Sequence, residues 1–142
     1  MQIRQLSVFL ENNQGILTEL AKRLGKDLVS ILAIALADSS RFGVVRCVVD
    51  DADKALALMQ ESGYSACLTD VLAVFTPEDA GGAGQVLECL SESGLDVEYI
   101  YMLRTLEGRP ALIIGVADTA LAERAVQKGG FVILREEDLK KA

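Results

Sequence analysis

The sequence predicts an α+β fold in which a βαββαβ unit is built twice, with antiparallel sheets and the helices on one face of each. The first observation behind this prediction is an internal repeat: aligning Gly15 with Gly81 keeps hydrophobic residues in step along the chain. The second is length, because each half of the 142 residues suffices for one small core but not for two. We therefore expect two tandem domains, residues 1–69 and 70–142.

The repeat keeps one offset up to a turn near Phe42 and Gly108, and beyond that turn the offset grows by a single residue. One added residue in a turn explains the change. A period this long indicates a duplicated domain rather than a solenoid repeat. Matched pairs are Phe9 with Phe75, Leu20 with Val86, Leu24 with Leu90, Ile31 with Val97, Asp51 with Asp118, Ala55 with Ala122 and Tyr64 with Phe131.

The elements of each repeat follow from hydrophobic spacing and from turn and cap residues. In the first repeat we expect a strand over Ile3–Leu10, a helix after Gly15, hairpin strands over Val29–Ala37 and Phe42–Val49, a helix from Asp51 to Gly63 and a short strand over Ala66–Leu68. In the second we expect a strand over Val71–Phe75, a helix over Val86–Leu90, a hairpin within Leu95–Val116, a helix over Thr119–Lys128 and a strand over Phe131–Leu134.

Right-handed crossovers place both helices of such a unit on one face of a four-stranded antiparallel sheet, which is the ferredoxin-like architecture. The other face should be polar in a monomer, yet Val29–Ala37 is apolar on both alternating sides, and Ala111–Val116 is similar. A large exposed apolar sheet is an association site. We expect a second chain, or the sister domain, to cover this sheet or its edge; alternatively, the strands are central and merely rich in β-formers.

Composition excludes several classes of partner. The formal net charge of −7 repels nucleic acid and anionic membrane surfaces. The longest apolar run, Ile31–Ala37, is far shorter than a bilayer crossing needs, and no leader-like segment opens the chain. Three spaced cysteines, Cys47, Cys67 and Cys89, leave an odd thiol in any disulfide scheme, and plain core packing in the reduced state is expected. We therefore expect a cytoplasmic protein.

The search for a catalytic or cofactor site returns mostly absences. The sequence contains no histidine, so the commonest general base and zinc ligand are missing. Acidic pairs lie at predicted turns or near the chain end, where solvated carboxylates are the default. Gly81-Gly82-Ala83-Gly84 opens a helix after a strand, but Leu87 stands at the third glycine of a dinucleotide motif, and no P-loop lysine follows. No cofactor or metal is expected.

The repeated strand-to-helix loop, around Gly15 and again around Gly81, remains as a candidate site. Amides at a helix start are unpaired and carry the positive end of the helix dipole, so they can hold a carboxylate. Glycine there lets a ligand approach. The alternative is that Asn13 or Asp79 simply caps its helix while the glycine serves the turn.

The stretch from Leu10 to Leu17, a strand end followed by a polar segment, glycine, any residue and leucine, resembles the first loop of the ACT family. Val29-Ser30-Ile31 is similar to the family's second-strand entry, where asparagine often stands in place of Ser30. The resemblance covers the whole chain as two tandem ACT domains, similar to the small stand-alone amino-acid-binding ACT proteins of bacteria.

The resemblance implies a free amino acid bound between two domains, with the loop and the second-strand entry supplying contacts. The ligand-binding residues it implies in the first repeat are Asn12, Asn13, Gln14, Gly15, Ile16, Leu17 and Ser30. The second repeat departs from the pattern, and its candidates are Glu78, Asp79, Gly81, Asp96 and Tyr99. Its acidic loop would repel a carboxylate, although Glu78 or Asp96 could hold an ammonium group. Tyr99 either walls a ligand or packs in a core or interface.

Three functions from different classes follow. The first is a non-catalytic regulatory protein, with a homodimer expected, whose amino-acid ligand shifts the pairing of domains or chains and so regulates a partner enzyme. The second is an assembly subunit that regulates its partner without a ligand. The third is a small ferredoxin-like enzyme such as an acylphosphatase, which would need an arginine in the loop after its first strand, and this loop has none.

Overall fold

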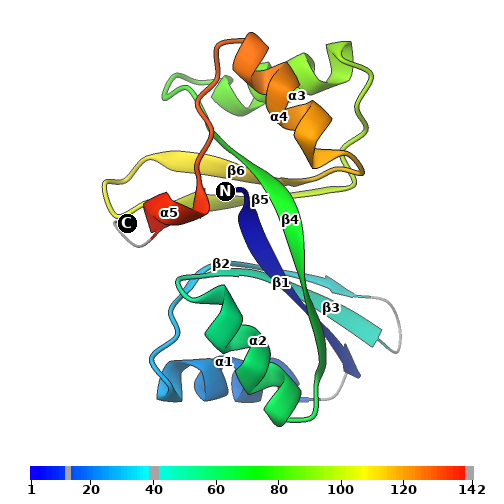
Figure 1. Cartoon of the computed structure of the whole chain (residues 1–142), viewed down its shortest axis with the longest axis vertical. Helices are drawn as coiled ribbons and strands as arrows, with labels where there is room; N and C mark the ends of the chain where they lie inside the picture. Colours follow the sequence, from blue (N-terminus) through cyan, green and yellow to red (C-terminus); the bar gives the residue numbers. More distant parts are fainter. Residues whose placement is uncertain (12–13, 39–41, 140–142) are drawn as a thin grey trace. The chain divides into compact units, whose positions relative to one another are not determined.

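A computed structural model describes residues 1–11, 14–38 and 42–139 of the chain. The chain divides into two compact units. The N-terminal unit is Arg4–Thr69, and the C-terminal unit runs from Asp70 to the end of the chain and includes Met1–Ile3. In Figure 1 each unit contains strands and a pair of helices, α1 and α2 in one unit and α3 and α4 in the other. None of the helices in the described part of the chain has the length and apolarity that a bilayer crossing requires.

The N-terminal unit has the predicted ferredoxin-like order of strands, β2-β3-β1-β4. β1 and β2 both pair antiparallel with β3, and the register joins Val8 to Val45 and Ile34 to Cys47. The first four elements are β1 (Ile3–Glu11), α1 (Ile16–Lys26), β2 (Ile31–Asp38) and β3 (Phe42–Val49), followed by α2 (Ala52–Glu61) and β4 (Ser65–Phe75).

One hydrophobic core holds this unit together. Both helices lie on one face of its sheet (Figure 1), with Leu20 and Leu24 of α1 fully buried. The Asp51 side chain accepts a hydrogen bond from the Lys54 amide at 3.2 Å, which caps α2 as predicted. Burial raises the pKa of the Cys47 thiol to about 12, so this cysteine is an inert core residue. Cys67, by contrast, is exposed, so the expectation of core packing is wrong there.

The C-terminal unit repeats the architecture with β4, β6 and β5 in that order. Its helices and strands are α3 (Gly82–Glu92), β5 (Tyr99–Arg104), β6 (Pro110–Gly115), α4 (Thr119–Lys128) and α5 (Glu136–Leu139). The Asp118 side chain accepts from the Leu121 amide at 3.0 Å and caps α4, as Asp51 caps α2. Core residues from α3 and α4, including Val86, Leu90 and Val126, pack on the sheet.

Two elements differ from the sequence prediction. The expected strands Ala66–Leu68 and Val71–Phe75 form one continuous strand, β4. The expected strand Phe131–Leu134 is a bridged segment beside β4: the Phe75 amide donates to the Val132 carbonyl, and the Leu134 amide donates to the Ala73 carbonyl, each at 2.9 Å. The short helix α5 that follows was not predicted, and it lies on the opposite side of β5 and β6 from α3 and α4 (Figure 1).

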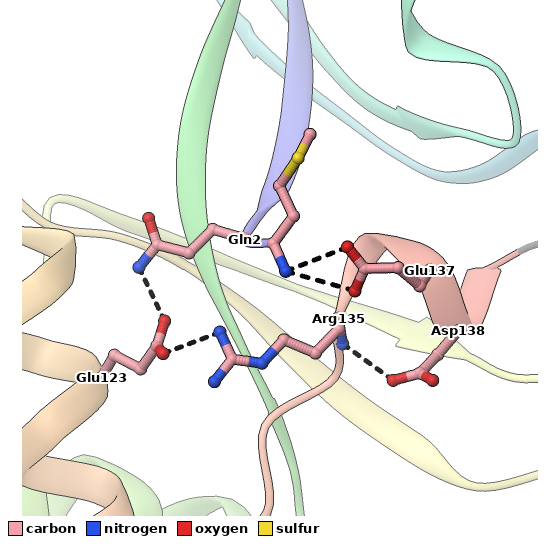
Figure 2. Close-up of polar contacts among 6 residues, drawn as sticks. Gln2, Glu123, Arg135, Glu137 and Asp138 are labelled. Carbon is pink, nitrogen blue, oxygen red and sulfur yellow. Dashed lines mark hydrogen bonds and ion pairs between the residues drawn. The ribbon is translucent and has the colours of Figure 1, made fainter.

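A polar network ties α5 and the first residues of the chain to α4 (Figure 2). Glu123 accepts from the Gln2 amide group at 2.8 Å and pairs with the Arg135 guanidinium at 2.7 Å. Burial opposes the charge of Glu123, but the two hydrogen bonds and the Arg135 charge outweigh it and hold the carboxyl pKa below its ordinary 4.5. The network therefore stabilises the fold only while Glu123 is ionised.

Glu123→Gln should lower the free energy of unfolding by about 1 kcal/mol at pH 7, because it removes the ion pair while keeping the shape of the side chain. Since the folded pKa is depressed, the contribution is complete above about pH 4.5 and is lost as the pH falls through the folded value. Urea unfolding at pH 7 and pH 3 tests this, with the exposed Glu88→Gln on α3 as control. Equal losses at both pH values would contradict it.

Candidate functional site

The N-cap residue of α1 is a glycine, which has no side chain with which to cap the helix. This residue, Gly15, has the left-handed conformation, with φ +83°. Asn12 and Asn13, the predicted polar contacts, lie outside the described residues. The amides at the start of this helix carry the positive end of the helix dipole, which gives them the capacity to bind a carboxylate.

A hollow of about 130 Å³ lies at this helix start. Three of the predicted residues, Gly15, Ile16 and Leu17, line it, so the structure brings the glycine and the helix start together around one space. The remaining lining residues are Leu10 and Glu11 at the end of β1, Thr18 of α1, Leu36 of β2 and Gly43 of β3. The hollow is thus closed on one side by the end of the β2–β3 hairpin.

The sequence analysis missed the hairpin residues of this hollow. One signal for them was available: Gly43 is a lone glycine in a strand pattern, which often marks a close approach of another group. A Cβ at Gly43 would lie 3.3 Å from Leu36 Cδ1, so the absence of a side chain there keeps the hollow open.

An apolar groove of about 600 Å³ runs along the outer side of α1 and β2 and shares Leu17 and Thr18 with the hollow. Its other lining residues are Ala21, Lys22, Ile31 and Ile34. β2 is the edge strand of its unit, and its Ile34 and Leu36 side chains are 44% and 52% exposed. Both pair with core residues of β3, so they lie on the helix side of this edge strand. The helix-free face also exposes apolar surface, because Phe9 of β1, which pairs with Val44, is 49% exposed there.

The edge strand of the C-terminal unit carries the same feature. Ile100 and Met102 of β5, which match Ile34 and Leu36 in the repeat, are 41% and 51% exposed. They pair with the core residues Ile114 and Leu112 of β6. Each unit therefore presents an apolar stripe on the helix side of its outer strand.

Ser30 and Gln14, also predicted as contacts, do not line the hollow. Ser30 lies at the opposite end of β2 from Leu36, where its amide donates to Asp50 Oδ1 at 2.9 Å and its carbonyl accepts from the Asp50 amide at 3.2 Å. Gln14 is exposed beside Gly15. Within one chain, the loop and the second-strand entry therefore do not meet at this hollow.

The helix start of the C-terminal unit has the same backbone conformation as that of the first repeat, but main-chain atoms occupy the space beside it. Gly81, with φ +90°, is the left-handed N-cap residue of α3, again with no capping side chain. At Gly82, however, a Cβ would overlap the Pro77 carbonyl oxygen, so the backbone occupies the place where Ile16 carries a side chain in the first repeat. The main chain of the loop before α3 therefore fills the space in which a ligand would have to bind.

The acidic candidates of this unit are spread along its surface. Glu78, Asp79 and Asp96 are exposed, and Asp79 accepts a hydrogen bond from the Gln85 side chain at 3.4 Å. The Tyr99 ring covers Gly115, its cross-strand partner on the face opposite the helices. Within the described ranges, no three or more cysteine or carboxylate residues gather in a way that could hold a metal ion.

Comparison with known proteins agrees with this fold. The family described as ACT domain pair matches residues 1–142. The crystal structure of protein BT0572 from Bacteroides thetaiotaomicron is similar at 30% identity and a TM-score of 0.90, over 100% of this chain and 98% of that one. No curated protein matches the sequence.

More distant structures share the fold. The ligand-free regulatory subunit of aspartate kinase from Thermus thermophilus has a TM-score of 0.64 at 18% identity, over 90% of this chain and 93% of that chain. The corresponding subunit from Thermus flavus has a TM-score of 0.62 at 20% identity, over 92% and 94%. Together with the family match over its full length, the repeated helix starts and the ferredoxin-like strand order show that this chain belongs to the ACT domain pair family.

Proposed function

We propose that this chain is a non-catalytic, cytoplasmic regulatory protein whose two ACT domains, residues 1–69 and 70–142, respond to a free amino acid. The observation that carries the proposal is the start of α1, with glycine as its N-cap residue, opening on a hollow. The ligand carboxylate would accept hydrogen bonds from the first amides of α1, and the helix dipole favours its charge. Leu10, Leu17 and Leu36 offer an apolar wall for the ligand side chain.

A hollow of about 130 Å³ is too small and too open to enclose a ligand by itself, so we expect a second chain to complete it. The exposed stripe on the edge strand β2 supports a homodimer. If two β2 strands pair antiparallel about Ala33, Ser30 of one chain comes beside Leu36 of the other. That pairing would supply Ser30 to the hollow, in agreement with the sequence-based set of contacts.

The second repeat contributes less to this proposal. The Pro77 carbonyl fills the position that Ile16 has in the first repeat, and the surrounding Glu78 and Asp79 disfavour a carboxylate. Glu78 or Asp96 could still hold an ammonium group, so Gly81 and its acidic neighbours, together with Tyr99, stay a secondary candidate. We therefore place the amino acid at the first repeat.

The signal would pass to a separate enzyme. The similar structures from the two Thermus species are named as regulatory subunits of aspartate kinase, which supports a partner enzyme for this chain as well. Ligand binding can shift the pairing of chains only if the amino acid binds the two arrangements with unequal affinity. A hollow completed by a second chain meets this condition, because separated chains would lack half of the contacts.

The second candidate function is an assembly subunit that binds no ligand, which the apolar edge strands favour on their own. Thermal unfolding against each of the twenty amino acids separates the two. A ligand that binds only the folded chain raises the unfolding midpoint by mass action. We expect a rise for one or a few amino acids; no rise at concentrations well above millimolar, in a protein that is dimeric by light scattering, would favour the assembly subunit.

A further inference from the structure

A second cavity, of about 270 Å³, lies in the C-terminal unit and is larger than the hollow at Gly15. The end of β4, the β5–β6 hairpin, the bridged segment after α4 and the helix α5 surround it. Its lining residues include Phe75, Glu107, Arg109, Leu134 and Asp138. Its size suits a ligand smaller than a typical drug molecule.

This cavity is not the counterpart of the hollow in the first repeat. Leu72 and Val74 of β4 belong to the core beneath α3 and α4, so alternation along the strand puts Phe75 on the opposite face of the sheet. The short helix α5, which contributes Asp138, lies on this same side (Figure 1). The helix starts of the two repeats, at Gly15 and Gly81, therefore do not line this cavity.

The exposed Arg109 side chain stacks its guanidinium on an aromatic ring at the cavity. Its central carbon lies 3.9 Å from the centroid of the Phe75 ring, which is the distance of a stacked cation–π pair. Among residues 1–11, 14–38 and 42–139, no carboxylate pairs with this guanidinium. A stacked guanidinium keeps the edge of its plane available for two parallel hydrogen bonds to a carboxylate.

Carboxylates line the cavity as well. Glu107 comes from the same hairpin as Arg109, and Asp138 comes from α5. One oxygen of Asp138 accepts from the Arg135 amide at 3.0 Å, and the network around Arg135 and Glu123 fixes this turn (Figure 2). The second Asp138 oxygen has no protein hydrogen bond within the described ranges. The buried Leu134 and the half-buried Phe75 supply apolar surface between these charges.

From this arrangement we propose that the cavity is a second ligand site, for a small zwitterion with an apolar body, namely an α-amino acid with an aliphatic side chain. Arg109 binds its carboxylate, and Glu107 with Asp138 binds its ammonium group. The side chain packs on Leu134 and Phe75. This site is separate from the hollow at Gly15, and the proposal goes beyond the function proposed above.

Amide chemical shifts during a titration with L-leucine test this site. In the folded wild-type chain we expect saturable shifts at Thr105–Arg109 and at Val132–Asp138. Arg109→Gln should weaken this binding by at least about tenfold, because the charge-assisted pair is lost. The control is Arg124→Gln, which removes an exposed guanidinium from α4 of the same unit and should leave the titration unchanged.

Two further comparisons examine the ammonium contact. The 2-oxo acid with the carbon skeleton of leucine, 4-methyl-2-oxopentanoate, should bind more weakly than leucine. Glu107→Gln should weaken the binding of leucine but not the binding of the oxo acid. The proposal is overturned if these resonances do not move at leucine concentrations well above millimolar, or if Arg109→Gln binds as wild type does. Shifts confined to Gly15–Thr18 would overturn this site and support the hollow at Gly15. Shifts confined to Thr105–Arg109 and Val132–Asp138 would support this site and count against the hollow.

Discussion

Gly82→Ala should lower the free energy of unfolding by about 1–3 kcal/mol, a large effect for adding one methyl group at a helix start. Gly82 is buried, and its added Cβ would overlap the carbonyl oxygen of Pro77, a backbone atom that cannot rotate away. Either the Pro77–Gly81 loop or the start of α3 has to move. Urea unfolding of the variant measures the loss.

Gly84→Ala is the matched control, because Gly84 lies in the same helix with no atom within 4 Å of an added Cβ. There alanine should stabilise the chain by about 0.5–1 kcal/mol through its better helix propensity. The two variants thus differ in sign within one turn of α3. If Gly82→Ala is as stable as wild type, the Pro77 carbonyl does not occupy this space, and only the acidic neighbours Glu78 and Asp79 are left as a reason for favouring the first repeat as the ligand site.

Gly43→Val should weaken amino-acid binding at the first repeat strongly while the chain stays folded. Gly43 lines the hollow, and a side chain there would point beside Leu36 Cδ1, into the space that the ligand needs. Valine suits a strand, and Leu36 is a partly exposed side chain that can shift, so the cost in stability should be modest. We expect affinity to fall by at least about tenfold, measured by titration calorimetry.

Gly25→Ala gives the comparison for this experiment. Gly25 lies in the last turn of α1, away from the hollow, and an added Cβ meets nothing within 4 Å. This variant should bind the amino acid as wild type does and be slightly more stable. Undiminished binding by Gly43→Val, with its fold intact, would place the ligand somewhere other than this hollow.

Local features of the fold were predictable from the sequence. The repeat placed glycine at both helix starts, and both Gly15 and Gly81 are left-handed N-cap residues there. Asp51 caps α2, and Asp118, its match in the repeat, caps α4, because a short polar acceptor followed by helical spacing is a local signal. The resemblance to the ACT family identified the segment around Gly15, which lines the hollow, as a candidate ligand site.

The face that Ile34 and Leu36 take was not predictable. A β-bulge between Ile31 and Ala33 shifts the alternation of β2 and turns Ile34 and Leu36 to the helix side of the edge strand. Because this run is apolar on both alternating sides, the sequence alone could not tell which face each residue would take.

The second cavity was missed for a different reason. Phe75 and Arg109 are far apart in sequence, and their contact depends on the pairing of β4 with β6 and on the hairpin geometry. In the sequence, charged residues such as Glu107 and Asp138, at a turn and near the chain end, have the pattern of ordinary solvent-exposed residues. Only their assembly around one space distinguishes them from ordinary surface charges.

The most direct test of the central claim is a crystal structure of the chain grown with the amino acid that raises the unfolding midpoint most. The account predicts the ligand in the hollow lined by Gly15, Leu17 and Gly43, with its carboxylate at hydrogen-bond distance from the first amides of α1. It also predicts Ser30 of a second chain beside the ligand. An amino acid bound elsewhere, with this hollow empty in a well-ordered crystal, would contradict the account.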